Sequence, residues 1–147
     1  MSKSLIKSVF TTEAGFGALA LRVPVGIIFA AHGAQKLFGW FGGYGLQGTA
    51  GWMESIGLAP GLLMALLAGA AEFLGGLALV FGLLTRPAAF ALSIAMLVAI
   101  FSVHFANGLF MSNNGYEFGL ALLAASVSLL LSGAGKASVD ALIAKKL

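Results

Sequence analysis

The sequence predicts an all-α membrane protein: an antiparallel bundle of four transmembrane helices with short helices at the membrane surfaces. Of its 147 residues, 60% are hydrophobic and 9% are charged, and the mean hydropathy is +1.03. Soluble domains average about 45–50% apolar and about 25% charged residues, so a water-soluble fold is excluded. Four long apolar stretches alternate with polar or glycine-rich turns. The length suits a single domain over residues 1–147.

The composition also excludes several kinds of site. The chain contains no cysteine, so it can form no disulfide, cysteine-ligated metal site, iron–sulfur cluster or thioether-linked haem. The net charge is +3, but the lysines lie near the chain ends rather than in one patch, so nucleic acid is not an expected partner. The first apolar run is too long for a signal peptide, and we expect no cleaved leader.

The N-terminal third begins with an amphipathic segment and a first span. Residues 1–10 place apolar side chains opposite Lys3 and Lys7, which predicts a helix on the membrane surface. The first span, about 15–37, is long enough to cross a bilayer but contains Arg22, which costs about 2.5–3.5 kcal/mol at helix depth on insertion scales. One helix face holds the residues that cannot face lipid: Arg22, Gly26, Phe29, Gly33 and Lys36.

The next region is predicted to run along the membrane surface and then return as a second span. Residues 38–60 are rich in glycine and aromatic side chains, which suits a headgroup-level belt. Thr49 is expected to cap a short interfacial helix there. The second span, about 61–83, surrounds Glu72 with small residues that let helices approach closely.

The C-terminal half is predicted to contain two more spans and a short helix. The third span covers about 87–106 and begins at Pro87, a residue favoured at helix starts. The fourth covers about 116–132, and Ser138 is expected to cap a terminal helix. Short loops favour antiparallel neighbours, and hence a compact up-and-down bundle.

Four spans place both termini on the same side of the membrane. Lys36 alone among the lysines falls on the opposite side. The positive-inside rule therefore predicts cytoplasmic termini. The basic residues on the side of the termini are Lys3, Lys7, Arg86, Lys136, Lys145 and Lys146.

Two polar residues are predicted to meet deep in the membrane. Arg22 lies 14 residues before Lys36, and Glu72 lies 12 residues after Pro60. At 1.5 Å of rise per residue, both lie about 20 Å below the outer surface. We therefore expect an ion pair between Arg22 and Glu72. Such a pair can serve a functional site or only lock two helices together, and the sequence leaves both interpretations open.

A second polar group is predicted near the outer surface, formed by His32, Lys36, His104 and Glu117. A mouth with these side chains between four helices suits a polar headgroup such as a quinone ring or an acidic metabolite. Simpler explanations also stand. Lys36 can extend to the lipid headgroups, and Glu117 can complement the dipole at a helix start.

Haem is a further, weaker hypothesis for the same region. His32 and His104 are expected at similar depth on the first and third spans, and bis-histidine ligation occurs in four-helix bundles. Two histidines are a weak signal, because either is harmless near the membrane surface. No metal is expected, since two imidazoles without cysteine make a poor zinc site.

Several stretches resemble the DoxX family of small membrane proteins. They are LRVPVGIIFAAHGAQKLFGW, AEFLGGLALVFGLLTRPAAFAL, SVHFANG, GYEFGLALL and SGAGKASVDALI. The resemblance covers about 15–143. Its most specific parts are Arg22-x-x-x-Gly26 with Gly33 and Lys36, Glu72-x-x-Gly75-Gly76, Gly82-x-x-Thr85-Arg86, His104, Glu117, and Gly133-x-Gly135-x-x-Ser138-x-Asp140. His32 is a less regular feature of the family.

The resemblance implies a four-span protein of the bacterial inner membrane. Some DoxX relatives are similar to the membrane subunit of thiosulfate:quinone oxidoreductase, and others are linked to membrane-associated oxidoreductase complexes. It implies quinone contact near Lys36, His104 and Glu117. It also implies that Arg86 and Asp140 are structural caps or partner contacts on the cytoplasmic side. It assigns no catalytic residue.

Three functions are compatible with these observations. The first is a quinone-interacting membrane subunit of an oxidoreductase complex. The second is a small-solute or proton-coupled carrier that uses Arg22 and Glu72 as a midplane switch. The third is a non-catalytic scaffold for a redox or stress-response complex. The lipid bilayer is the expected partner in each case, together with oxidoreductase subunits in the first, and a homo-oligomer remains open.

Overall fold

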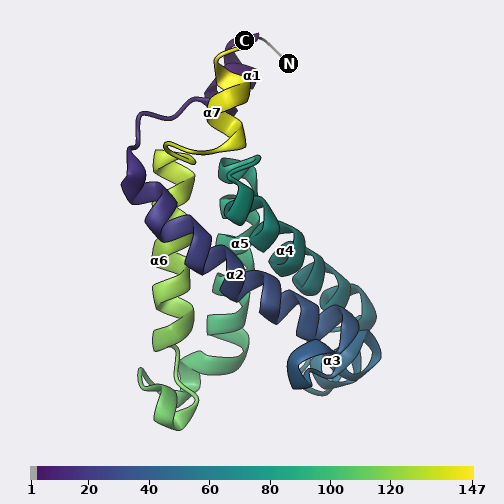
Figure 1. The fold of residues 1–147 in the computed structure, drawn as a ribbon. Coiled ribbons are helices and arrows are strands. Elements are labelled where there is room, and N and C mark those ends of the chain that lie inside the picture. The colour runs from purple at the N-terminus through teal and green to yellow at the C-terminus, as the bar shows by residue number, and fades with distance from the viewer. Residues whose placement is uncertain (1–2) are drawn as a thin grey trace.

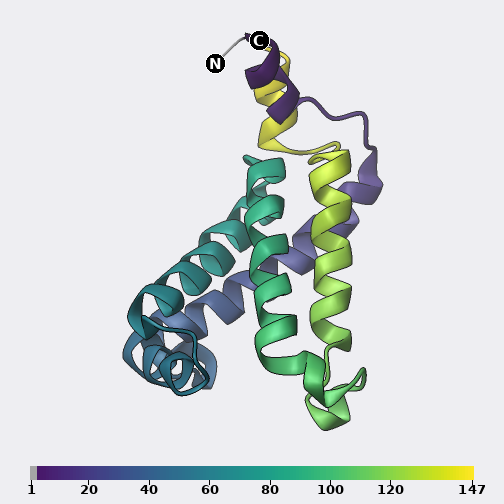
Figure 2. The same cartoon turned by 180° about the vertical axis from the view of Figure 1, so that it is seen from behind.

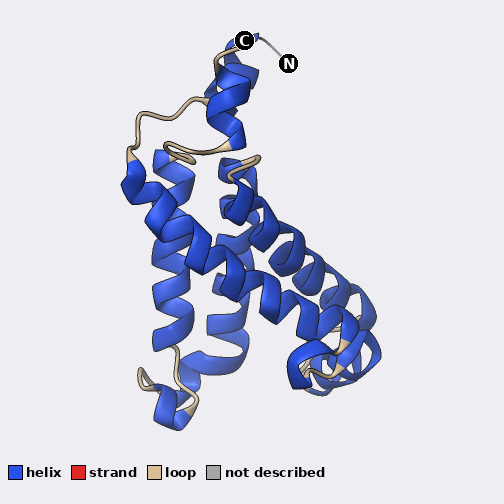
Figure 3. Ribbon diagram, viewed as in Figure 1, coloured by secondary structure: helices blue, strands red, loops and turns tan. Residues whose placement is uncertain are grey.

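The computed structural model describes residues 3–147, so Met1 and Ser2 of the predicted amphipathic segment lie outside the described residues. The described part consists of helices and loops without strands (Figure 3). The α-helices are α1 Lys3–Phe10, α2 Phe16–Phe38, α3 Gly45–Ser55, α4 Gly61–Phe81, α5 Thr85–Ala99, α6 Glu117–Ser132 and α7 Val139–Ala144. Shorter turns are the 3₁₀ segments Trp40–Gly42, Phe105–Asn107 and Met111–Asn113 and the π-helical turn Ile100–His104.

Three helical segments are long and apolar enough to cross a membrane. They correspond to the first three predicted spans: Phe16–Phe38, Gly61–Phe81 and Thr85–Asn107. The fourth apolar helix, α6, has 16 residues and is about 24 Å long, less than the roughly 30 Å of a hydrocarbon core. Its crossing of the membrane therefore stays a prediction.

Helices α2 and α4 cross at close range because glycines meet at the contact. A Cβ added to Gly33 would lie 2.2 Å from the backbone nitrogen of Phe73. A Cβ added to Gly76 would lie 2.4 Å from the backbone nitrogen of Ala30. Only glycine allows the two backbones to approach so closely, as at other small-residue helix contacts in membranes.

The four long helices form two pairs that diverge from one end of the molecule (Figures 1 and 2). Both termini, α1 and α7 lie at one end, which we call the termini end. At the opposite end, α2 and α4 meet α3, while α5 and α6 end beside each other at some distance. Between the pairs lies the apolar core, which includes Phe29, Leu79, Leu92 and Leu129.

Two predicted caps have different outcomes. The Ser138 side chain accepts a hydrogen bond from the Ala141 nitrogen at 3.1 Å, so the cap of α7 is confirmed. The predicted cap at Thr49 is wrong, because Thr49 lies inside α3. Its hydroxyl donates instead to the Lys36 carbonyl oxygen on α2 at 3.4 Å. The side chain thus ties α3 to α2 rather than starting a helix.

Candidate functional site

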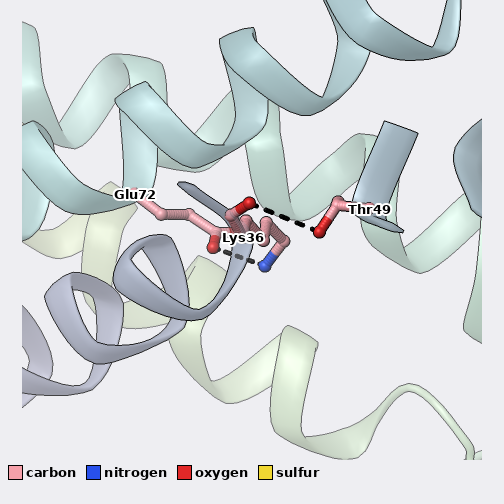
Figure 4. A network of polar contacts seen from close by, with 3 residues as sticks. All are labelled: Lys36, Thr49 and Glu72. Carbon is pink, nitrogen blue, oxygen red and sulfur yellow. Dashed lines mark hydrogen bonds and ion pairs between the residues drawn. The ribbon is translucent and has the colours of Figure 1, made fainter. Parts of the chain in front are cut away.

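A buried ion pair joins α2 to α4 in the half of the molecule away from the termini. Lys36 Nζ donates to Glu72 Oε2 at 2.6 Å (Figure 4). The Glu72 side chain is 6% exposed and the Lys36 side chain is 25% exposed. The small residues around Glu72, Gly69 and Gly76 among them, bring α2 close enough for this contact. The amine retains two further N–H donors, since an ammonium group has three.

The ion pair borders a cavity of about 130 Å³ between the helix pairs, which we call the inner cavity. Its polar lining residues are His32, Lys36, Glu72 and His104. Apolar side chains from α2, α5 and α6, such as Phe29, Met96 and Leu122, form much of the remaining wall. We refer to this end of the molecule as the cavity end. A mostly apolar cleft with a few convergent polar groups is the usual form of a small-molecule site.

His104 reaches the inner cavity from an irregular part of the third span. The helix widens into a π-helical turn at Ile100–His104, a feature common at functional sites. His104 Nδ1 lies 2.9 Å from the Asn114 carbonyl oxygen. A carbonyl oxygen only accepts, so this contact assigns the hydrogen to Nδ1. Nε2 is then the acceptor of the neutral ring.

The structure brings together three of the four residues predicted to bind a ligand. His32, Lys36 and His104 all line the inner cavity, and the His32 ring lies 6.0 Å from the Phe118 ring of α6. Glu117 has a different role. Its carboxylate accepts from the Met111 backbone nitrogen at 3.0 Å and so holds the preceding loop.

The predicted ion pair between Arg22 and Glu72 is wrong, because each residue has other partners. Arg22 is 1% exposed and donates to five backbone carbonyl oxygens. Its Nη1 donates to Val80 O at 2.8 Å and to Leu79 O at 3.2 Å, both in the last turn of α4. Its remaining acceptors, in the segment before α7, are the carbonyl oxygens of Ala134, Lys136 and Ala137.

The depth estimate failed because it placed Pro60 level with Lys36. In the structure, Gly69 packs against Lys36, and Gly82 packs against the Arg22 guanidinium. Helix α4 therefore begins eight residues, or about 12 Å, beyond the level of Lys36. This shift places Glu72 beside Lys36 and moves Arg22 to the end of α4.

Two more charged residues, Asp140 and Arg86, stabilise the termini end through hydrogen bonds to the backbone. Asp140 is 1% exposed, and its carboxylate accepts from the backbone nitrogens of Leu84 at 2.7 Å and Thr85 at 2.9 Å. It therefore caps the start of α5, where a negative charge is favoured. Arg86 Nη1 donates to Leu130 O and Leu131 O near the end of α6, each at 2.6 Å.

Sequence reasoning missed two contributors to the inner cavity. Met96 lines it from α5 as a buried side chain, and Met111 lines it from the loop before α6. Methionine in an apolar span gives no distinctive signal, because it is also a common core residue. Among residues 3–147, no group of three or more His, Cys, Asp or Glu side chains is arranged to hold a metal ion.

This chain has clear relatives among known proteins. The DoxX family model matches residues 17–105, which include Arg22, Lys36, Glu72 and His104. Among curated proteins, the "Putative oxidoreductase CatD" of Bacillus subtilis (strain 168) is 36% identical over 129 residues, covering 88% of each chain. No solved structure gives a significant match.

Two further relatives come from other bacteria. The "Inner membrane protein YqjF" of Escherichia coli (strain K12) is 36% identical over 136 residues, covering 88% of this chain and 94% of the relative. An uncharacterized protein of Haemophilus influenzae is 36% identical over 129 residues, covering 86% of this chain and 90% of the relative. The family match extends over more than half of the sequence and these relatives over most of it, so this chain belongs to the DoxX family of membrane proteins.

Proposed function

We propose that the inner cavity binds the ring of a quinone and that the protein is a quinone-interacting membrane subunit of an oxidoreductase complex. One observation supports this most directly. The Lys36–Glu72 ion pair, at 2.6 Å, and the His104 ring line the same largely apolar cavity. A charged pair whose only task was to lock two helices would need no adjoining cavity.

The polar groups of the cavity match both redox states of such a ligand. The carbonyl oxygens of an oxidised quinone only accept hydrogen bonds, and Lys36 has N–H groups beyond the one given to Glu72. The hydroxyl groups of the reduced quinol need acceptors. Glu72 and His104 Nε2 provide them. The site thus contains donors and acceptors for either form.

The size of the cavity favours a ligand with one ring. Its volume is about 130 Å³, close to the ~150 Å³ of an engineered protein cavity that accepts benzene. A porphyrin is several times larger, so this volume supports a quinone better than haem ligation by His32 and His104. The exposed apolar side chains of Met111 and Phe118 at its border suit the apolar chain of a membrane quinone.

The relatives and the charge distribution support a cellular setting for this function. One relative is named a putative oxidoreductase and another an inner membrane protein. In this chain, seven of the eight Lys and Arg residues, Arg22 among them, lie at the termini end, and Lys36 lies at the cavity end. By the positive-inside rule, the termini end is cytoplasmic and the inner cavity lies towards the outer surface of the bacterial inner membrane.

The alternatives have less support. The carrier hypothesis needs Arg22 and Glu72 to act together at the midplane, and Arg22 instead donates to five carbonyl oxygens at the end of α4 and before α7. A scaffold without chemistry needs tight packing around Glu72. The inner cavity beside Glu72 does not favour that arrangement.

The test is to purify the protein in mild detergent, extract it with organic solvent and identify co-purifying quinones by mass spectrometry. A short-chain ubiquinone analogue is then titrated while tryptophan fluorescence is followed. We expect saturable binding that weakens at least tenfold in Glu72→Gln. Glu13→Gln is the matched control, because it changes an exposed carboxylate at the termini end that does not line the inner cavity, and its affinity is expected to be unchanged.

Two results would contradict the proposal. One is the absence of saturable binding by the folded protein. The other is equal weakening in both variants, which would place the ligand outside the inner cavity. An absorbance spectrum of the same sample tests the haem hypothesis, since bound haem gives a strong Soret band.

A further inference from the structure

A second cavity lies beside the Lys36–Glu72 pair. Its volume is about 410 Å³, and we call it the outer cavity. It is formed by the end of α2, the turn after it and the helix α3. Its lining residues are Gln35, Lys36, Gly42, Gly43, Tyr44, Thr49 and Trp52. Its side chains are polar or aromatic, whereas Phe29, Met96 and Leu122 form part of the wall of the inner cavity.

Lys36 is the residue that the linings of the two cavities share. Its side chain is 25% exposed, whereas that of its partner Glu72 is 6% exposed. Glu72 lines the inner cavity and does not line the outer one. The exposed fraction thus falls from Lys36 to Glu72. This is expected if the Lys36 side chain separates the outer cavity from the inner cavity.

The frame around Lys36 is fixed by contacts on both sides of the outer cavity. Thr49 Oγ1 donates to the Lys36 carbonyl oxygen at 3.4 Å (Figure 4), and Gln35 Nε2 donates to the Phe41 carbonyl oxygen at 3.2 Å. A Cβ added to Gly43 would lie 2.5 Å from Gln35 Cα, so the turn packs directly onto α2. The flexible part of this region is therefore the Lys36 side chain, with its four-carbon stem.

The borders of the two cavities differ in the side chains that they present. The exposed side chains at the border of the inner cavity are the apolar Met111, at 46% exposure, and Phe118, at 37%, together with the ring of His32. Charged solutes do not enter through such a border when it faces lipid. The outer cavity presents the Lys36 amine, the Gln35 amide and the Thr49 hydroxyl, which suit water and small polar solutes.

We propose that Lys36 is the gate of a polar entrance through which water, and protons with it, passes from the outer cavity to the inner cavity. This deepens the proposed function and rests on it for its purpose, because a quinone exchanges protons as well as electrons. The ligand ring enters through the apolar border, and protons enter past Lys36. Glu72, on the inner side of the gate, is the first acceptor that they reach.

The test uses the absence of cysteine from the chain, which makes single-cysteine variants free of background labelling. Met96→Cys places a thiol in the inner cavity. Its modification by small water-soluble methanethiosulfonate reagents is timed in lipid nanodiscs, where both faces of the membrane are accessible. Adding Lys36→Ala is expected to raise the rate at least tenfold. Adding Lys36→Met, which removes the charge but keeps the length, is expected to accelerate at most the cationic reagent.

The controls separate an open route from other causes. Thr49→Cys, in the outer cavity, is expected to react rapidly with Lys36 present or replaced. Ser126→Cys, a nearly isosteric change at a fully buried position of α6 that lines neither cavity, reports general loosening of the bundle. Cationic and anionic reagents are both used, because an opened route accelerates both, whereas loss of a positive charge alone accelerates only the cationic one.

The proposal is overturned if, in otherwise folded protein, Met96→Cys reacts equally fast with and without the added Lys36→Ala substitution, or if only the cationic reagent is accelerated. It is also overturned if Ser126→Cys, the buried control, accelerates in parallel. These outcomes do not depend on quinone. A protein that binds no quinone but shows the Lys36-dependent labelling therefore contradicts the proposed function while leaving the gate in place.

Discussion

Each end of this bundle contains a positively charged residue of α2 that packs against α4, but the two residues form hydrogen bonds of different kinds. Arg22, at the termini end, is 1% exposed and donates to carbonyl oxygens of α4 and of the segment before α7. Lys36, at the cavity end, has one carboxylate partner at 2.6 Å and stands between two cavities.

This difference indicates that Arg22 stabilises the fold, whereas Lys36 is available to bind a ligand. The planar guanidinium has five N–H donors in a fixed fork, and Arg22 makes five hydrogen bonds with them. Nothing is left for a ligand. The ammonium of Lys36 keeps unused donors beside open space, and its stem can rotate. The charged residues of the motifs thus divide between holding the fold and forming the site.

The largest expected effect is that of Arg22→Met. The substitution removes a donor from five carbonyl oxygens at the termini end. Leu79 O keeps a hydrogen bond from the Gly82 nitrogen at 3.2 Å, and each buried group left unsatisfied costs about 1–3 kcal/mol. We expect a loss of at least about 4 kcal/mol, since some of the carbonyls will reach water. For a chain of this size, that lowers the midpoint of thermal unfolding by roughly 8 °C or more. Circular dichroism in detergent measures it.

Arg22→Lys provides the control for this prediction. An ammonium on a shorter reach replaces at most part of the fork, so it should recover only a minority of the loss. Full recovery would show that the charge matters and the five-donor geometry does not. That result would remove the contrast between the two ends.

The sequence predicted the fold well because composition and hydrophobic periodicity determine it. The three long spans agree with the structure within a few residues, and the shared face of Gly26, Gly33 and Lys36 does meet α4. Periodicity fixes which side of a helix is buried. It does not fix how far one helix slides along another, and that axial register decides which polar residues meet.

The candidate site could be predicted only in part for the same reason. His32, Lys36 and His104 were recognised as a polar group near one surface and do line one cavity. The pairing of Glu72 with Lys36 was not predicted, because nothing in the sequence showed that α4 starts well beyond the level of Lys36. The π-helical turn at Ile100–His104 also lacks a local signature, since its residues are ordinary for an apolar helix.

The second prediction tests the close glycine contact between α2 and α4. Gly33→Ala places a methyl group 2.2 Å from the Phe73 nitrogen, a backbone atom that cannot move aside. Overpacking of this kind costs about 1–3 kcal/mol, and it should also separate Lys36 from Glu72. Gly17→Ala, on the same helix with nothing within 4 Å, is the matched control. Similar melting curves for the two variants would contradict the crossing geometry.

The third prediction concerns the cap at the termini end. Asp140→Asn keeps one side-chain acceptor for the nitrogens of Leu84 and Thr85 but loses the charge that faces the start of α5. We expect a loss of about 1 kcal/mol. The binding of the quinone analogue should be unchanged, because the cap lies at the opposite end from the inner cavity. A change in affinity comparable to that of Glu72→Gln would show that the two ends are coupled.

The smallest effect on stability is expected when Lys36 and Glu72 are both replaced, although this change should have the greatest effect on quinone binding. Replacing both members of a buried ion pair by apolar residues is often neutral, whereas removing one leaves an unpaired charge. The double variant Lys36→Met with Glu72→Leu should therefore unfold within about 1 kcal/mol of the unmodified protein, and Glu72→Leu alone should be less stable than the double variant. Thermal unfolding and quinone titration are measured on the same samples. If the double variant keeps its stability and loses its ligand, the pair exists for the site. If it loses both, Lys36 and Glu72 hold the fold as Arg22 does.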